Sequence, residues 1–188
     1  MAGKKIIGRR KSLSELEEIL DATLKAYNVD KNHVTVLETS DTTEAIEALK
    51  NGEVHAAMLP GSIPTAPIIE LAQTTDVVFI DVNDKIDEIL SYLSPAFYKT
   101  VVPAGTYKGQ DQDVVMVGVN GGLVVAESIP EEVVYKVTKA ILDHPDAFKS
   151  VHQSAVYWTL PEAAENLPIP VHKGALKYYQ EKGIDVNG

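Results

Sequence analysis

The chain has 188 residues, of which 45% are hydrophobic and 23% are charged, the balance of an ordinary globular protein. Its 17 basic residues against 27 acidic residues give a formal net charge of -10, which argues against nucleic acid as a partner, because that binding needs a basic surface. The chain has no cysteine, so disulfides, thiolate nucleophiles and cysteine-ligated metal centres are excluded.

The first half of the chain alternates strand-like runs with helical patterns. A short strand is expected at Lys4–Gly8, and an apolar stripe over Ser12–Tyr27 predicts a helix. A capping box of Ser12 with Glu15, or of Ser14 with Glu17, would open that helix. The alternation continues with strands expected at 33–38, 54–59 and 76–82, and with helices expected at 40–52, from Pro64 or Pro67 to 75, and at 83–93. Such repetition predicts a mainly parallel sheet with right-handed crossovers.

The pattern changes near residues 95–105. Strand-rich segments separated by glycine-bearing loops are expected at 97–105, 114–121 and 122–128, and helices at 130–144 and from about Lys173 to Lys182. We therefore expect an α/β lobe over residues 1–100, and crossover strands with C-terminal helices over residues 101–188.

No residue pattern points to catalysis. The five histidines show no HxxxH spacing, and there is no GxSxG elbow, GxGxxG turn or phosphate-binding loop. We therefore expect no catalytic residue, no metal site and no cofactor, and we predict that the protein is not an enzyme. An enzyme built on this α/β sheet is the least favoured alternative.

Three strand-to-helix loops carry the candidate binding residues. The loop Met58–Pro67 follows a strand and precedes a helix, the position at which ligands bind in open α/β sheets. Backbone N–H groups at a helix start attract carboxylates or phosphates, and Ser62 and Thr65 would add hydroxyl donors. The alternative is that Ser62 or Thr65 only caps the helix.

The two preceding loops have the same construction. Glu38–Ala45 brings Ser40 and two threonines to a helix start, and Gly8–Glu15 brings Ser12 beside three consecutive basic residues. Three such loops along one sheet edge favour a small anionic or polar ligand. For the basic residues a solvated surface is the commoner explanation, and the acidic residues of the second loop oppose an anion.

Several stretches, in order, resemble the TAXI family of solute-binding proteins of TRAP transporters over about Lys4 to Ile184. They are "EAIEALKNGEVHAAML", "PGSIPTAPIIELAQTTDVVFI", "VVPAGTYKGQDQDVVMVGV", "SIPEEVVYKVTKAIL" and "NLPIPVHKGALKYYQEKGI". The resemblance implies a periplasmic-binding-protein-like lobe, with a mainly parallel sheet flanked by helices and C-terminal β/α segments that return toward a first lobe.

The resemblance also implies a function. A small organic solute of the amino acid or dicarboxylate type, with glutamate as one model, would be captured in the periplasm or another extracytoplasmic space. It would then be delivered to the membrane subunits of a TRAP transporter. The expected binding groups lie at helix starts, with Tyr107 as an aromatic wall: Ser12, Ser40, Gly61, Ser62, Thr65 and Tyr107.

The chain departs from the family at its start. Family members carry a signal peptide and about a first lobe before the strand that matches "KKIIG", so a truncated form that supplies the second lobe is expected. The glycine-serine-threonine loop usual after that strand reads "GRRKSLSE" here. Exposed returning segments would favour homo-oligomers. The alternative function is therefore a ligand-free, self-associating interaction module of the same fold.

Overall fold

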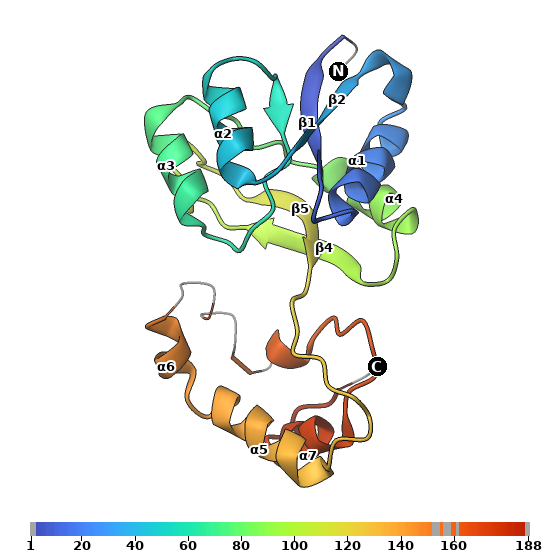
Figure 1. Ribbon diagram of the computed structural model, residues 1–188, viewed down its shortest axis with the longest axis vertical. Helices are drawn as coiled ribbons and strands as arrows, with labels where there is room; N and C mark the ends of the chain where they lie inside the picture. The colour runs from blue at the N-terminus through green and yellow to red at the C-terminus, as the bar shows by residue number, and fades with distance from the viewer. Residues whose placement is uncertain (1–2, 152–154, 156–158, 161, 187–188) are drawn as a thin grey trace. The chain divides into compact units, whose positions relative to one another are not determined.

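The computed structural model describes residues 3–151, 155, 159–160 and 162–186 (Figure 1). The chain forms two compact units, Met1–Gly118 and Val119–Gly188, which we call unit 1 and unit 2. The change of sequence pattern near residue 100 falls inside unit 1, where two further strands follow.

Unit 1 is built on a parallel sheet. Strand β1 (Lys5–Arg10) lies between β2 (Thr35–Thr39) and β3 (Ala56–Ala57), and pairs in parallel with both. Helices connect the successive strands, as a parallel arrangement requires. The predicted α/β fold, with a parallel sheet flanked by helices, is confirmed.

Helices α1 (Glu15–Ala26) and α2 (Thr42–Lys50) pack on opposite faces of this sheet (Figure 1). Consecutive strand residues point to opposite faces, so Ile6 joins a cluster with Leu20 of α1 whereas Ile7 joins a cluster with Ala45 of α2. Both isoleucines are almost completely buried. The alternation thus explains why a strand with two adjacent isoleucines sits at the centre of the sheet.

Gly8 lies within β1 and does not end it, contrary to the prediction. The pairing with β2 shifts between Ile7 and Arg9, which makes Gly8 the extra residue of a bulge. A Cβ atom on Gly8 would lie 2.2 Å from Cδ2 of Leu20. Glycine therefore allows α1 to approach the sheet closely at this point.

The helix starts of α1 and α2 differ in how they are capped. At α2, Asp41 is the N-cap and its Oδ1 accepts a hydrogen bond from the N–H of Glu44 at 2.9 Å. At α1, Ser14 is the N-cap and makes no side-chain cap bond, so the predicted boxes are wrong. Glu17 is engaged instead by Arg9, at 2.7 Å.

The remainder of unit 1 follows the predicted order with one exception. Helix α3 (Ala66–Thr74), the 3-10 turn η2 (Asn83–Lys85), helix α4 (Ile86–Ser91) and the paired strands β4 (Phe97–Val102) and β5 (Val114–Val119) are present, as is a short 3-10 turn η1 (Lys31–His33). The strand predicted at 76–82 does not form. Val77 and Phe79 pack on a core cluster there, whereas Val78 is 91% exposed.

Unit 2 is organised by two helices. Helix α5 (Glu131–Leu142) packs against α7 (Lys173–Glu181), and the shorter α6 (Pro145–Lys149) and η4 (Glu162–Ala164) lie between them in sequence. Its core cluster gathers around Tyr178, which is fully buried. The strand predicted at 122–128 is wrong, since these residues form no strand and Leu123 is 72% exposed.

Candidate functional site

The three loops that carry the candidate residues follow three adjacent parallel strands. Arg10 of β1 pairs with Thr39 of β2, and Ile7 of β1 pairs with Ala57 of β3. The hydrogen bond from the N–H of Met58 to the carbonyl of Ile7 (2.8 Å) continues the last pairing. The carboxyl ends of the strands therefore share one edge of the sheet, as the sequence predicts for the loops after them.

Ser12 and Ser40 come from the first two loops. Ser12 is exposed in the turn between β1 and α1. Ser40 is exposed directly after β2, and its N–H donates to Oε2 of Glu44 at 2.6 Å. Together with the bond from Glu44 N–H to Asp41, this closes a reciprocal cap on α2. The start of α2 is thus already supplied with carboxylate acceptors from its own sequence.

Gly61, Ser62 and Thr65 come from the third loop. Thr65 is the N-cap residue of α3, yet its side chain makes no cap hydrogen bond. Its backbone N–H donates to the hydroxyl oxygen of Tyr107 at 3.3 Å. A Cβ atom on Gly61 would lie 3.4 Å from Cγ2 of Thr65, so the loop folds back on the helix start. Ser62 is half-buried in this turn.

Tyr107 is part of the core of unit 1. It is 5% exposed, and its ring stacks on Phe79 with the ring centroids 5.0 Å apart. Gln110 accepts the Tyr107 N–H through Oε1 and donates through Nε2 to the carbonyls of Val102 and Gln112. The Tyr107 hydroxyl accepts a hydrogen bond at the start of α3, and the residue shares a core cluster with Ile68 and Ala72 of that helix, so in this structure it positions the loop.

Arg9 forms a charged cluster with α1. Its Nη2 lies 2.7 Å from Oε1 of Glu17, and Nζ of Lys31 lies 3.0 Å from the same oxygen and 2.6 Å from Asp21. The hydrogen bond from Arg9, followed by that from Lys31, lowers the pKa of Glu17. This arrangement holds the loop after β1 against α1, with little electrostatic stabilisation because all four groups are well exposed.

Arg10 faces the opposite helix. Its Nη2 donates to the hydroxyl of Thr42, in the first turn of α2, at 2.6 Å. The Nε atoms of Arg9 and Arg10 are both buried and have no hydrogen-bond partner among the described residues. Arg10 is a candidate binding residue that the sequence analysis missed, because it explained the basic residues of this loop as solvated surface. The position of a basic residue at the carboxyl end of a strand could have indicated it.

The described residues form no metal-binding site. In that part of the chain, no three His, Cys, Asp or Glu side chains lie close enough together to hold a metal ion. None of the helices there combines the length and apolar character that crossing a bilayer demands. Of the candidate residues, the structure brings Gly61, Thr65 and Tyr107 together, and places Ser12 and Ser40 on the two neighbouring loops of the same edge.

The parallel α/β sheet with polar loops along its carboxyl edge is consistent with a lobe of a binding protein. The profile of the NMT1-like family matches residues 1–183. The chain belongs to this family of periplasmic solute-binding proteins, which are related to the binding proteins of transporters.

Proposed function

We propose that this chain binds a small organic solute at the carboxyl edge of the β2-β1-β3 sheet and delivers it to a TRAP-type transporter, as a protein of the TAXI type. The binding makes and breaks no covalent bond. The family assignment supports a solute-binding role with a transporter as partner. The resemblance of the Pro103–Tyr107 and Leu167–Ala175 stretches supports the narrower class.

One observation carries the proposal. Three successive parallel strands end at one edge, and each is followed by a loop that brings hydroxyl and backbone donors: Ser12 after β1, Ser40 after β2, and Ser62 with Thr65 after β3. Hydroxyl and backbone groups orient a small polar ligand without the desolvation cost of a buried charge. The Thr65 side chain makes no bond to the helix start and is available for this role.

Arg10 supports an acidic solute. Its guanidinium lies at the same edge, close to the start of α2, and presents a planar donor set that matches a carboxylate. The carboxylates of Asp41 and Glu44 nearby are engaged in the α2 cap. A solute with a carboxylate beside a polar group, as in glutamate, fits this combination of one cation and several hydroxyls.

Native mass spectrometry of the purified chain, followed by calorimetric titration with glutamate and dicarboxylates, tests the proposal. We expect a monomer that carries a small acidic molecule. Alanine at both Ser62 and Thr65 should weaken binding about tenfold, since two hydrogen bonds are lost. Ser128→Ala, exposed in unit 2, is the matched control. An affinity within twofold of the parent for the double variant would contradict the proposed site.

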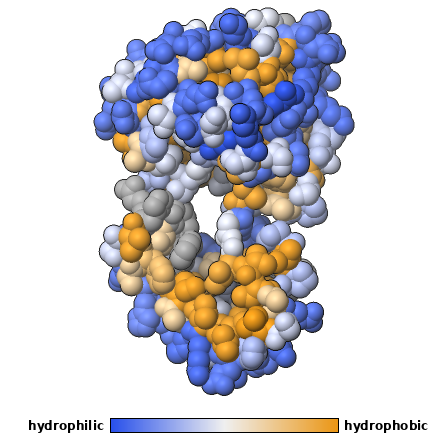
Figure 2. All heavy atoms as spheres, in the orientation of Figure 1, coloured by the Kyte–Doolittle hydropathy of each residue, from blue (hydrophilic) through white to orange (hydrophobic). Residues whose placement is uncertain are grey.

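A second candidate function, a self-associating module, is favoured by the surface of unit 2. Several large apolar residues of unit 2 have exposed side chains: Leu123, Val124, Val133, Val137, Val151 and Ile169. Figure 2 shows apolar side chains gathered on the face of unit 2 seen in that view. A ligand-free dimer in the same native mass spectra would support this function over solute capture.

A further inference from the structure

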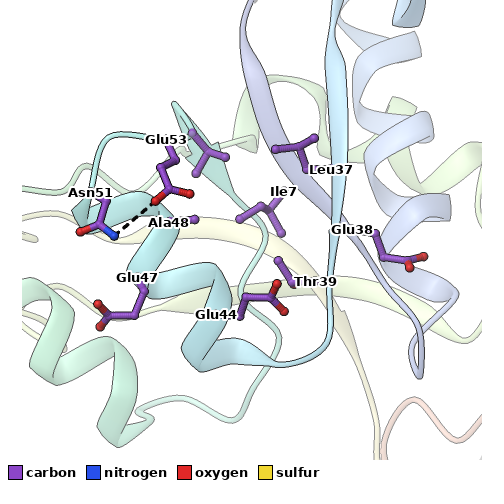
Figure 3. Close-up of a pocket in the computed structure, with 10 residues that line it drawn as sticks. Ile7, Leu37, Glu38, Thr39, Glu44, Glu47, Ala48, Asn51 and Glu53 are labelled. Carbon is purple, nitrogen blue, oxygen red and sulfur yellow. Dashed lines mark hydrogen bonds between the residues drawn. The ribbon is translucent and has the colours of Figure 1, made fainter.

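A hollow with a volume of about 260 Å³ lies between β2 and α2 (Figure 3). Its glutamates point in different directions, since Glu38 lies apart from the others and Glu53 turns toward Asn51, at 3.4 Å. Arg10 pairs with Thr39 at the same end of the sheet and adds a positive charge. The charges around this hollow share neither a sign nor a meeting point, so it indicates no class of ligand.

A smaller hollow, of about 180 Å³, lies beside the run 76–82, where the predicted strand does not form. Val78 and Phe79 line it on one side, and the loop from Gly109 to Gln112 lines it on the other. The run therefore borders an open space into which a side chain of another segment can pack.

The run 76–82 has the side-chain alternation of a strand but lacks a strand partner in the described part of the chain. Phe79 packs on a core cluster of unit 1, whereas Val78 is 91% exposed and Ile80 is also exposed. Among the described residues, the backbone N–H and C=O groups of 76–81 form no hydrogen bond. Unpaired backbone groups beside exposed apolar side chains are a template for a further strand.

The run 121–125 of unit 2 has the same two properties. Leu123 and Val124 are 72% and 70% exposed, and within the described ranges the backbone groups of 121–125 form no hydrogen bond. The sequence from Val114 to Ala126 also contains no charged residue. Two copies of a chain with a net charge of -10 repel each other, and an uncharged run is the part of the surface where that repulsion is weakest.

Charge selects the direction in which the two runs can pair. We align Val78 with Val124, the most exposed valine of each run. A parallel pairing would then place Asp81 opposite Glu127, and like charges directly opposite each other destabilise a sheet. An antiparallel pairing places Asp81 opposite Gly121 instead. The antiparallel direction is therefore favoured.

The antiparallel register also fills the smaller hollow. It places Leu123 directly opposite Phe79, which lines that hollow and packs on the core cluster. Opposite residues of a strand pair lie on the same face, so the leucine side chain would enter the hollow and be buried there. Cross-strand pairs of an aliphatic and an aromatic side chain stabilise a sheet.

From these observations we propose that the run 76–82 of one copy pairs in the antiparallel direction with the run 121–125 of a second copy, with Val78 opposite Val124. A two-fold arrangement lets each copy give one run and receive the other, so the pairing is reciprocal. The backbone groups of both runs then gain the hydrogen bonds of a strand ladder. The proposal rests on the second candidate function, self-association, and names the surface that carries it.

Disulfide cross-linking tests the register, because the chain has no cysteine of its own. A Val78→Cys variant is mixed with a Val124→Cys variant of different mass and oxidised. Opposite residues of an antiparallel pair lie within the Cα separation that a disulfide spans. We expect cross-linked heterodimers of the two variants. Mixing Val78→Cys with Val133→Cys, which is exposed on α5, is the matched control and should give no such product.

Analytical ultracentrifugation measures what the pairing contributes to the dimer. Val124→Lys places a charge inside the paired run and should raise the dimer dissociation constant about tenfold, because that charge loses water without gaining a partner. Val137→Lys makes the same change at an exposed position of α5 and should leave the dissociation constant unchanged.

The outcomes separate this interface from self-association itself. A dimer that fails to cross-link between positions 78 and 124, or that Val137→Lys weakens as much as Val124→Lys does, would overturn the interface and leave self-association standing. Cross-links that form only within a single chain carrying both cysteines would overturn the interface too. A chain that stays monomeric at every concentration would contradict the second candidate function and the interface together.

Discussion

Unit 1 and unit 2 bury their apolar residues in different ways. In unit 1, Ile6 and Ile7 are buried on opposite faces of a strand that has a strand on each side. In unit 2, the run Leu123–Val125 is just as apolar but has no strand partner among the described residues, and it is exposed. Two strand neighbours satisfy the backbone N–H and C=O groups of β1 and allow both of its faces to be covered, which the Leu123–Val125 run lacks among the described residues.

The two units also use glycine differently at their closest contacts. A Cβ atom on Gly8 of unit 1 would meet the end of the Leu20 side chain at 2.2 Å. A Cβ atom on Gly174 of unit 2 would meet the carbonyl oxygen of Glu131 at 2.3 Å and the N of Tyr135 at 2.8 Å. A leucine side chain can rotate away, whereas the backbone of α5 cannot, so unit 2 tolerates less change.

The largest effect is expected from Ile7→Ala, which should lower the stability of unit 1 and leave that of unit 2 unchanged. The side chain is buried in the cluster between β1 and α2, so its loss should cost about 3 kcal/mol of unfolding free energy. Amide hydrogen exchange measured by mass spectrometry should accelerate in peptides of unit 1. Leu37→Ala, at a partly exposed position on the adjacent strand, should cost less than half as much. Equal acceleration in unit 2 would contradict separate cores.

A smaller effect is expected from alanine at the two glycines. Gly174→Ala should cost about 2 kcal/mol, because α5 and α7 must move apart, whereas Gly8→Ala should cost about 1 kcal/mol, because only Leu20 must change rotamer. Urea unfolding of both variants measures the difference. If Gly8→Ala proved the more damaging, the distinction between side-chain and backbone contacts would be wrong.

The smallest effect concerns Asp143 of unit 2. Hydrogen bonds from Lys139, then Lys182 and Tyr178, hold the pKa of this carboxyl well below its usual value. The ionised group therefore stabilises the folded state above the unfolded-state pKa of about 3.9, and that contribution is lost as pH falls below it. Asp143→Asn should lower stability near neutral pH and flatten the acid limb of the stability curve. An acid limb as steep as that of the parent would show that Asp143 does not titrate in this way.

Local sequence patterns predicted most of the helices and strands, because these elements depend largely on residues that are close in sequence. The apolar stripe placed α1 within a few residues, and the predicted bounds of α2 and α7 were equally close. Gly52, with φ of +69°, ends α2 as expected. The strands predicted at 76–82 and 122–128 failed because a strand needs a partner that local sequence does not reveal. Glu17 failed as a capping residue because Arg9 and Lys31 compete for it.

The candidate sites were predictable to different degrees. The loops that follow adjacent parallel strands lie at the same edge of the sheet. The sequence alone could therefore group four candidate residues: Ser12, Ser40, Ser62 and Thr65. That Tyr107 is a core residue depends on stacking with Phe79, a contact across 28 positions that no local pattern gives.

The bulge at Gly8 assigns the two arginines to their helices. Strand side chains alternate between faces, so an unbroken β1 would send Arg9 toward α2, with Ile7, and Arg10 toward α1. The extra residue reverses this order, and Arg9 reaches Glu17 of α1 while Arg10 reaches Thr42 of α2. Deleting Gly8 would remove the bulge but keep Arg9 next after Ile7 in the alternation, so both arginines should keep their helices. The partners of the two cations thus depend on Gly8 staying outside the pairing with β2, and a register in which Gly8 paired would exchange them.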